Sequence, residues 1–231
     1  MTVNKLPAHT SNYTLCTSRT IHYIVVHYTG NKGDTARANC NYFASANRQA
    51  SAHYFVDDDS IWQSVDDKNR AWHCGSNTGV YYHQYCRNAN SIGIEICMWD
   101  SNGKLRPKAI ENAVELTRFL MDKYSIPSSN VVRHYDVTHK LCPKPMVDDY
   151  SLWCKFKTDV EKKVEDLTKD ETIDVIKEQD KAVEKLPVSS WAKDAWTVLT
   201  NEGVTDGSSP QAPMTREQFA VMLQRLGFIG K

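Results

Sequence analysis

Short apolar runs alternate with helical spacings of apolar residues along the first two thirds of the chain. The run at 21–28 is β-branched and aromatic and stops at a Thr-Gly pair, so it predicts a buried strand that ends near His27. The stretch SAHYFVDDDSIWQSV at 51–65 predicts two strands joined by an Asp-rich turn. SIGIEICM at 91–98 and the valines at 131–132 predict further strands. These segments are enough for a central sheet.

Two stretches between the strands carry apolar residues at helical spacing. Asp34 is expected to cap a first helix that runs through residues 38–43. Pro107 opens a second helix with a long apolar stripe. The stripe consists of Ile110, Val114, Leu116, Phe119, Leu120 and Tyr124. Because strands and helices alternate, the predicted fold class is α/β, with a mixed central sheet flanked by helices.

The pattern changes after residue 157. Charged residues of both signs fill more than half of the positions at 155–185, so a charged, partly helical linker is expected over residues 158–186. Residues 187–231 carry two amphipathic stretches separated by a loop rich in Gly and Pro, which predicts a small all-α module. The chain is therefore expected to have a domain at 1–157, a linker and a C-terminal module.

Composition narrows the class of partner. The 231 residues include 28 basic and 28 acidic side chains, so nucleic acid is disfavoured as the main partner. No apolar run is long enough to insert into a membrane, and the first twenty residues lack the apolar core of a secretory signal. Seven scattered cysteines are typical of reduced thiols, although a single disulfide such as Cys74–Cys86 stays open. These features predict a protein made in the cytoplasm.

The clearest chemical signal comes from three residues far apart in the chain. His27 ends a predicted strand, whereas His134 and Cys142 lie together in RHYDVTHKLCPKP. Imidazole and thiolate are zinc ligands, and three protein ligands leave one position for a water whose pKa falls toward neutrality. A small buried thiol is the alternative reading for Cys142. The set indicates a hydrolase.

Several strings occur together in an order typical of one family: HYTG after an apolar strand, SAHYFVDDDSIWQ, SIGIEI and RHYDVTHKLCPKP. Residues from about 20 to 157 resemble the type 2 zinc-dependent N-acetylmuramoyl-L-alanine amidases, which include phage endolysins, autolysins and peptidoglycan recognition proteins. The resemblance implies one zinc per chain on His27, His134 and Cys142. It also implies hydrolysis of the amide between N-acetylmuramic acid and L-alanine in peptidoglycan.

The resemblance assigns roles to further residues. Glu95, inside the apolar strand SIGIEIC, corresponds to the general base, although strand alternation alone also allows an outward-facing residue. Lys140 corresponds to the cation that stabilises the oxyanion, and a solvated loop lysine is the alternative. His53 is expected to support a ligand or the substrate, and Trp72 and His73 are expected to contact the muramyl or peptide portion. Hydrogen-bonded core histidines are the alternative reading.

The C-terminal stretch resembles a single S-layer homology motif. The matching residues are Trp191, Ala192, Lys193, Ala195, Trp196, the turn 203–207, Pro213, Thr215, Arg216 and Glu217. The resemblance implies that the module binds a cell-wall polymer. Because one copy is small, two alternatives stay open: a homo-oligomer of three chains that pools these tails, or docking of the module on the catalytic domain.

An amidase domain, a charged linker and a wall-binding tail together suggest a phage or prophage endolysin that lyses the host wall. Such a protein is made in the host cytoplasm and acts on the wall after release. Two main alternatives stay open: a cytoplasmic amidase that recycles muropeptides, and a recognition protein that binds peptidoglycan without cleaving it. An inhibitor of a polymerase built on the same fold is a third.

Overall fold

The computed structural model describes the chain except residue 77 and residues 163–186, 190–191, 209–215, 227 and 229–231. It divides into two compact units, Met1–Lys162 and Lys163–Lys231, which are described separately. Most of the expected linker lies outside the described residues, as do Trp191, Pro213 and Thr215.

A six-stranded mixed sheet forms the centre of the first unit, with the strand order β1-β5-β4-β7-β3-β8. The strands are β1 (Val3–Lys5), β3 (Tyr23–Tyr28), β4 (Tyr54–Val56), β5 (Ile61–Gln63), β7 (Ser91–Ile96) and β8 (Val131–Arg133). Only the β4–β5 pair is antiparallel, and it forms the hairpin expected at 51–65. Asp57 closes this turn by accepting hydrogen bonds from the backbone N–H groups of Asp59 and Ser60, at 3.0 and 2.6 Å. The predicted α/β class is therefore confirmed.

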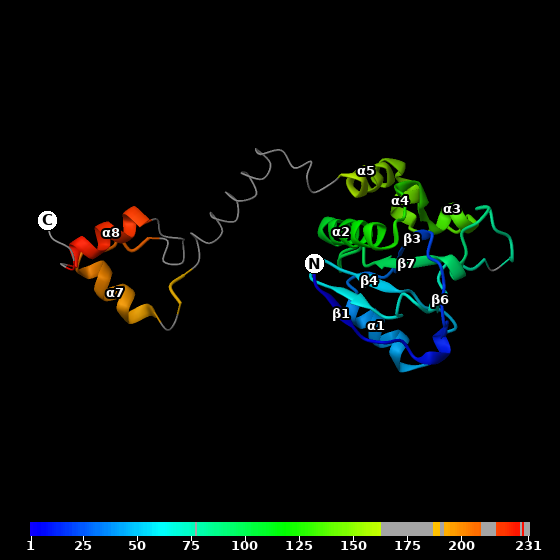
Figure 1. Ribbon diagram of the computed structural model, residues 1–231, viewed down its shortest axis with the longest axis horizontal. Coiled ribbons are helices and arrows are strands. Elements are labelled where there is room, and N and C mark those ends of the chain that lie inside the picture. The colour runs from blue at the N-terminus through cyan, green and yellow to red at the C-terminus, as the bar shows by residue number, and fades with distance from the viewer. Residues whose placement is uncertain (77, 163–186, 190–191, 209–215, 227, 229–231) are drawn as a thin grey trace. The chain divides into compact units, whose positions relative to one another are not determined.

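Alternation along the strands divides the core between two faces of the sheet. Ile24 and Val26 of β3 and Ile92 and Ile94 of β7 point to the face that carries the largest apolar cluster. Helix α2 (Pro107–Tyr124) covers this face, and α5 (Tyr150–Glu161) packs against α2. Figure 1 shows α2 on one side of the sheet and α1 (Ala36–Ser45) on the other. The opposite face carries a smaller apolar cluster that includes Val25 and Val132, together with His27 and Glu95.

The expected first helix begins slightly later than its sequence suggests. Thr35, not Asp34, is the N-cap, because the Thr35 hydroxyl accepts a hydrogen bond from the Ala38 N–H at 3.1 Å. Asp34 instead accepts from the Asn39 amide at 2.7 Å. The helix expected to begin at Pro107 does so, with the proline in the first turn.

Several elements lack a clear sequence signal. They are the ribbon of β2 (Tyr13–Thr14) with β6 (Arg70–Ala71), the short helices α3 (His134–Thr138) and α4 (Lys144–Asp148), and the 3-10 turns Thr10–Asn12, Asn88–Asn90 and Ser128–Asn130. Helix α5 also continues to Glu161, beyond the boundary expected at residue 157, because Val160 belongs to the main core. The sequence near this boundary is rich in charged residues, but one face of the helix that it forms is buried.

The second unit contains the two helices expected from its amphipathic stretches, α7 (Lys193–Asn201) and α8 (Arg216–Arg225). Its described residues leave large apolar side chains exposed, among them Val198, Phe219 and Phe228. Across the described part of both units, we find no helix that combines the length and apolar character needed to span a bilayer.

Candidate metal centre

Strand register brings the first two site residues together. In the parallel pair β3–β7, His27 lies opposite Glu95, and both side chains project from the face that α2 does not cover. The His27 Nδ1 and Glu95 Oε1 atoms are 4.0 Å apart. His27 is buried, whereas 21% of the Glu95 side chain is exposed. Glu95 is therefore half-buried beside His27, on the sheet face opposite Ile94 and Ile96.

The other two candidate ligands come from one compact turn. His134 begins α3 directly after β8, and the chain then turns so that the Tyr135 N–H donates to the Cys142 carbonyl at 2.8 Å. The Cys142 Sγ lies 3.6 Å from His27 Nδ1. The candidate ligand atoms of His27, His134 and Cys142 all lie within 4.8 Å of one another. The tertiary structure thus brings the three predicted ligands into one cluster.

The cluster has the polarity that a bound cation requires. Both ring nitrogens of His134 are buried, and neither has a partner with hydrogen-bond geometry among the described residues, although the nearby Gly75 backbone acts to raise the pKa of this ring. Such atoms are costly to bury unless a ligand satisfies them. A set of two imidazole nitrogens and one sulfur matches the donors that zinc prefers. The residues present therefore fit a zinc ion.

Burial keeps both candidate histidine ligands neutral. It lowers the pKa of His27 well below its usual value, and the neighbouring His134 lowers it further. Burial, followed by Lys140, lowers the pKa of His134 to about 4. Neutral imidazole has the lone pair that a metal needs. Burial also raises the pKa of the Cys142 thiol to about 12, so metal binding must release this proton.

A chain of hydrogen bonds sets the tautomer of His27. The Ser91 hydroxyl donates to the Arg87 carbonyl at 2.7 Å, so it accepts from His73 Nε2 at 3.2 Å. His73 Nδ1 then accepts from His27 Nε2 at 3.1 Å. The remaining His27 nitrogen, Nδ1, has its lone pair on the side of Cys142. Partners of this kind orient metal ligands and fix their protonation.

These contacts change the role expected for His73. Both of its ring nitrogens are occupied, and only 8% of the residue is exposed, so it positions His27 and has little surface for substrate. Ser91 and Gly93 also support the site and were missed in the sequence. Their signal was alternation in β7, because residues 91, 93 and 95 share one face.

We expect Gly93→Ala to destabilise the protein by about 1–3 kcal/mol and to weaken zinc binding. A Cβ at this position would lie 2.5 Å from the His73 ring, which would have to leave His27. Gly75→Ala is the matched control, because a Cβ there meets no heavy atom within 4 Å. Urea unfolding and zinc titration of both variants test this, and equal behaviour of the two would contradict it.

His53 is fully buried and has no exposed atom with which to contact a substrate. Its Nδ1 accepts a hydrogen bond from the Gly93 N–H at 3.0 Å, and its Nε2 donates to the Asn69 carbonyl at 3.1 Å. The Arg19 guanidinium also approaches Nε2, at 3.2 Å, and donates to the Ser91 carbonyl at 2.7 Å. His53 therefore supports the floor beneath His73.

This buried histidine makes stability depend on pH. Burial lowers the pKa of folded His53 well below 6.5, so the unfolded chain binds more protons in acid. The free energy of unfolding should fall as the pH drops below about 6.5, by up to about 1.4 kcal/mol per pH unit for this group. Urea unfolding of chelated protein at several pH values should show a weaker dependence for His53→Gln. The exposed control His22→Gln should keep the native slope, and an unchanged slope in His53→Gln would contradict the assignment.

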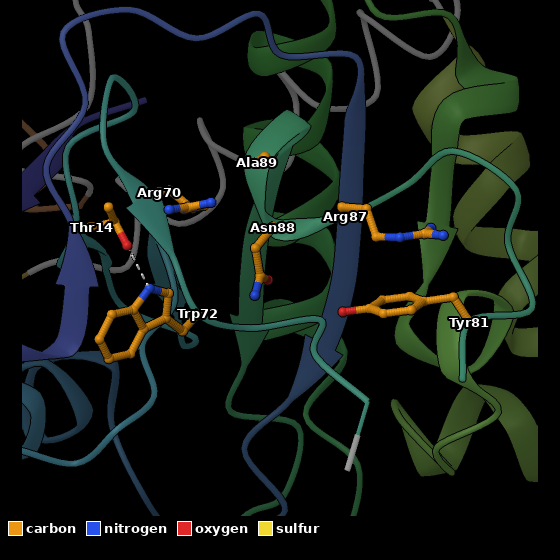
Figure 2. Close-up of a pocket in the computed structure, with 7 residues that line it drawn as sticks. All are labelled: Thr14, Arg70, Trp72, Tyr81, Arg87, Asn88 and Ala89. Carbon is orange, nitrogen blue, oxygen red and sulfur yellow. Dashed lines mark hydrogen bonds between the residues drawn. The ribbon is translucent and has the colours of Figure 1, made fainter. Parts of the chain in front are cut away.

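Trp72 borders a pocket whose lining includes none of the three candidate ligands (Figure 2). Its indole N–H donates to the Thr14 hydroxyl at 3.0 Å, which fixes the ring. The pocket has a volume of about 310 Å³ and is also lined by Arg70, Tyr81 and Arg87. The predicted substrate contact of Trp72 thus has a cavity in which it could occur.

All seven cysteines are free thiols in this structure, including Cys74 and Cys86.

Comparisons with known proteins agree with this geometry. A family model described as N-acetylmuramoyl-L-alanine amidase matches residues 17–145. The N-acetylmuramoyl-L-alanine amidase CwlL of Bacillus licheniformis is 34% identical over 157 residues, which cover 65% of this chain and 42% of the relative. The chain thus spans less than half the length of that relative.

Two solved structures share the fold. The structure of PlyL is 33% identical with a TM-score of 0.60, and the match covers 70% of this chain and 98% of PlyL. A mutant endolysin from Bacillus subtilis is 29% identical with a TM-score of 0.59, and that match covers 69% and 99% of the two chains. Since the family model spans more than half of the sequence and includes all three candidate ligands, the chain belongs to the N-acetylmuramoyl-L-alanine amidase family.

Proposed function

We propose that this protein is a zinc-dependent peptidoglycan hydrolase that cleaves the amide between N-acetylmuramic acid and L-alanine. The observation that carries the proposal is the cluster of His27, His134 and Cys142, whose candidate ligand atoms lie within 4.8 Å of one another in a chain of this family. One zinc ion held by these side chains would supply Lewis acidity, polarise the amide carbonyl and lower the pKa of a water.

Glu95 is the proposed general base. Its Oε2 is buried without a partner among the described residues, and it lies on the same sheet face as His27. Burial raises the pKa of Glu95 to about 8, while the nearby Lys140 acts in the opposite direction. A carboxylate with such a pKa accepts a proton from water more readily than a solvated one, and a neighbouring cation favours its ionised form.

Lys140 is the proposed oxyanion stabiliser. Its charge affects the pKa values of His27, Glu95, His134 and Cys142, so it lies within electrostatic range of the whole cluster. An ammonium group in this place can donate to the carbonyl oxygen as that oxygen gains negative charge.

Lys140→Gln should lower kcat about 10²-fold or more while zinc content stays near that of the native protein. The reason is that Lys140 would contact the reacting oxygen and not the metal. Steady-state rates with metal analysis test this, and Lys108→Gln on the exposed side of α2 is the control. Loss of zinc from Lys140→Gln would instead give Lys140 a structural role.

The function itself is tested with purified peptidoglycan and zinc-loaded protein. New L-alanine amino termini should appear in step with the loss of wall turbidity, and chelation should stop both. If the protein binds the wall but releases no amino termini, a recognition protein without activity is the better assignment.

The second unit supports a role at the wall as a further part of this proposal. We infer that it binds a cell-wall polymer and associates with other copies. Its described residues include Lys193 at the start of α7, and they expose apolar side chains that a partner could cover. Tethering would raise the local concentration of the first unit at its substrate. The structural similarity to an endolysin favours lysis of the host wall after release over muropeptide recycling.

A further inference from the structure

Two buried cysteines lie next to each other beside the metal centre, and neither has a part in the proposed reaction. Cys74 and Cys86 are both fully buried and belong to the smaller apolar cluster around Val25. Cys74 directly follows His73, and its Sγ lies 3.8 Å from the Ser91 hydroxyl. The Cys86 thiol also reaches this hydroxyl. The pair therefore contacts the group that positions His73.

The two thiols are within hydrogen-bonding reach of each other. The Cys86 thiol donates to the Cys74 sulfur, which lowers the pKa of Cys74 and raises that of Cys86. The backbone agrees with this contact, because the Cys74 N–H donates to Asn88 Oδ1 at 2.8 Å and so holds residue 74 beside the segment 86–88. Cysteines on adjoining segments with their thiols in contact can be joined without a large movement of the backbone.

A bond between these sulfurs would close the segment 75–85, of which residue 77 lies outside the described residues. The Tyr82 N–H in this segment donates to the Val137 carbonyl at 2.9 Å. The Tyr82 ring also stacks on His139, with 3.5 Å between the ring centres. These contacts connect the segment to α3, whose first residue is a candidate zinc ligand. A covalent link at the base of the segment would restrict the unfolded chain and so stabilise the folded one.

We propose that Cys74 and Cys86 are a redox-sensitive pair that forms a disulfide once the protein has left a reducing compartment, and that this bond stabilises the first unit. Thiols persist in the cytoplasm, whereas disulfides form and persist outside it. The change of compartment rests on the proposed function at the cell wall, but the chemistry of the pair does not. The bond would strengthen the fold around His73 in the place where the protein acts.

The oxidant is a low-molecular-weight disulfide. The Cys74 thiolate attacks one sulfur of this compound, forms a mixed disulfide with it and releases the other half as a thiolate. The Cys86 thiol then gives up its proton, and its sulfur attacks the Cys74 sulfur and expels the second half. The two protein thiols lose two electrons and two protons, and the oxidant becomes two thiols. Because both cysteines are buried, the first step requires local opening of the segment 75–85.

The test uses zinc-loaded full-length protein that is incubated in native buffer with an excess of oxidised glutathione. Digestion without reduction should give one linked peptide pair that contains residues 74 and 86. The Tm of the oxidised protein should exceed the Tm of the same protein after treatment with a phosphine reductant by about 5–10 °C. Absence of the linked peptides, their formation only in urea, or equal Tm values would overturn the proposal.

Two single substitutions separate this pair from the other thiols. Cys86→Ser cannot form the bond, so its Tm should be the same under oxidising and reducing conditions. Cys154→Ser makes the same change at an exposed position of α5 and should keep the native difference. A difference that persists in Cys86→Ser would belong to other thiols and overturn the proposal. If Cys86→Ser does not fold, the linked peptides and the Tm of the native protein still decide the outcome.

None of these measurements uses peptidoglycan, so the disulfide and the proposed hydrolysis can fail independently. A linked and stabilised protein that releases no amino termini from walls would support the redox-sensitive pair and overturn the proposed function. An active protein that forms no link between residues 74 and 86 would overturn the redox-sensitive pair alone.

Discussion

Glu95→Gln is expected to lower the rate of amide hydrolysis by about 10²- to 10⁴-fold while zinc binding stays close to native. Glutamine keeps the size of the side chain but cannot accept a proton from water. The loss should be large because Glu95 is the acidic residue paired with His27 in the strand register, and its Oε2 has no other partner among the described residues.

Measurement of kcat together with bound zinc tests the role of Glu95. Glu111→Gln is the matched control, since Glu111 is an exposed residue on α2, and it should retain native activity. Native activity in Glu95→Gln would show that another group accepts the proton. Loss of zinc along with activity would show that Glu95 acts mainly through the metal ligands.

Cys142→Ser is expected to abolish both stoichiometric zinc binding and activity. Hydroxyl oxygen replaces a thiolate that lies beside His27, so one of three protein ligands is lost. The variant should also lose the stabilisation that zinc gives the native protein, which reaches about 4 kcal/mol at a free zinc concentration near 1,000 times the Kd.

Metal analysis and thermal unfolding with and without chelator measure these losses. Chelation should destabilise the native protein but leave Cys142→Ser unchanged. Cys154→Ser makes the same chemical change at an exposed position of α5 and should behave as the native protein does. If Cys142→Ser keeps one zinc per chain with native affinity, the proposed ligand set is incorrect.

Much of the fold was predictable because local signals and tertiary packing agree in the first unit. The strand at 21–28, the hairpin at 51–65 and the helix at Pro107 carry strong periodicity, turn chemistry or capping. The last turn of α5, from residue 158, falls in the expected linker because its charged residues obscure a buried face that includes Val160. Pairing with α2, which local composition does not report, decides that this segment belongs to the first unit.

The sequence determined the candidate ligands, because His27, His134 and Cys142 are residue types with zinc chemistry in a recognisable motif order. It also determined that Glu95 lies in an apolar strand, where an ionised carboxylate is costly to bury unless it is paired or has a function. Roles that depend on neighbours could not be read in this way. The sequence predicts that His53 supports a ligand or the substrate and that His73 contacts the substrate, but it does not state which of their ring atoms are already hydrogen-bonded.

Only the tertiary structure decided those roles. The parallel register placed Glu95 beside His27, and Gly93 left room for the His73 ring to reach His27. The pocket near Arg70 likewise forms only when the chain folds, because its lining residues come from segments separated by up to 75 positions. Sequence specifies the chemistry that each side chain carries, whereas distances, burial and hydrogen-bond partners arise when distant segments pack together.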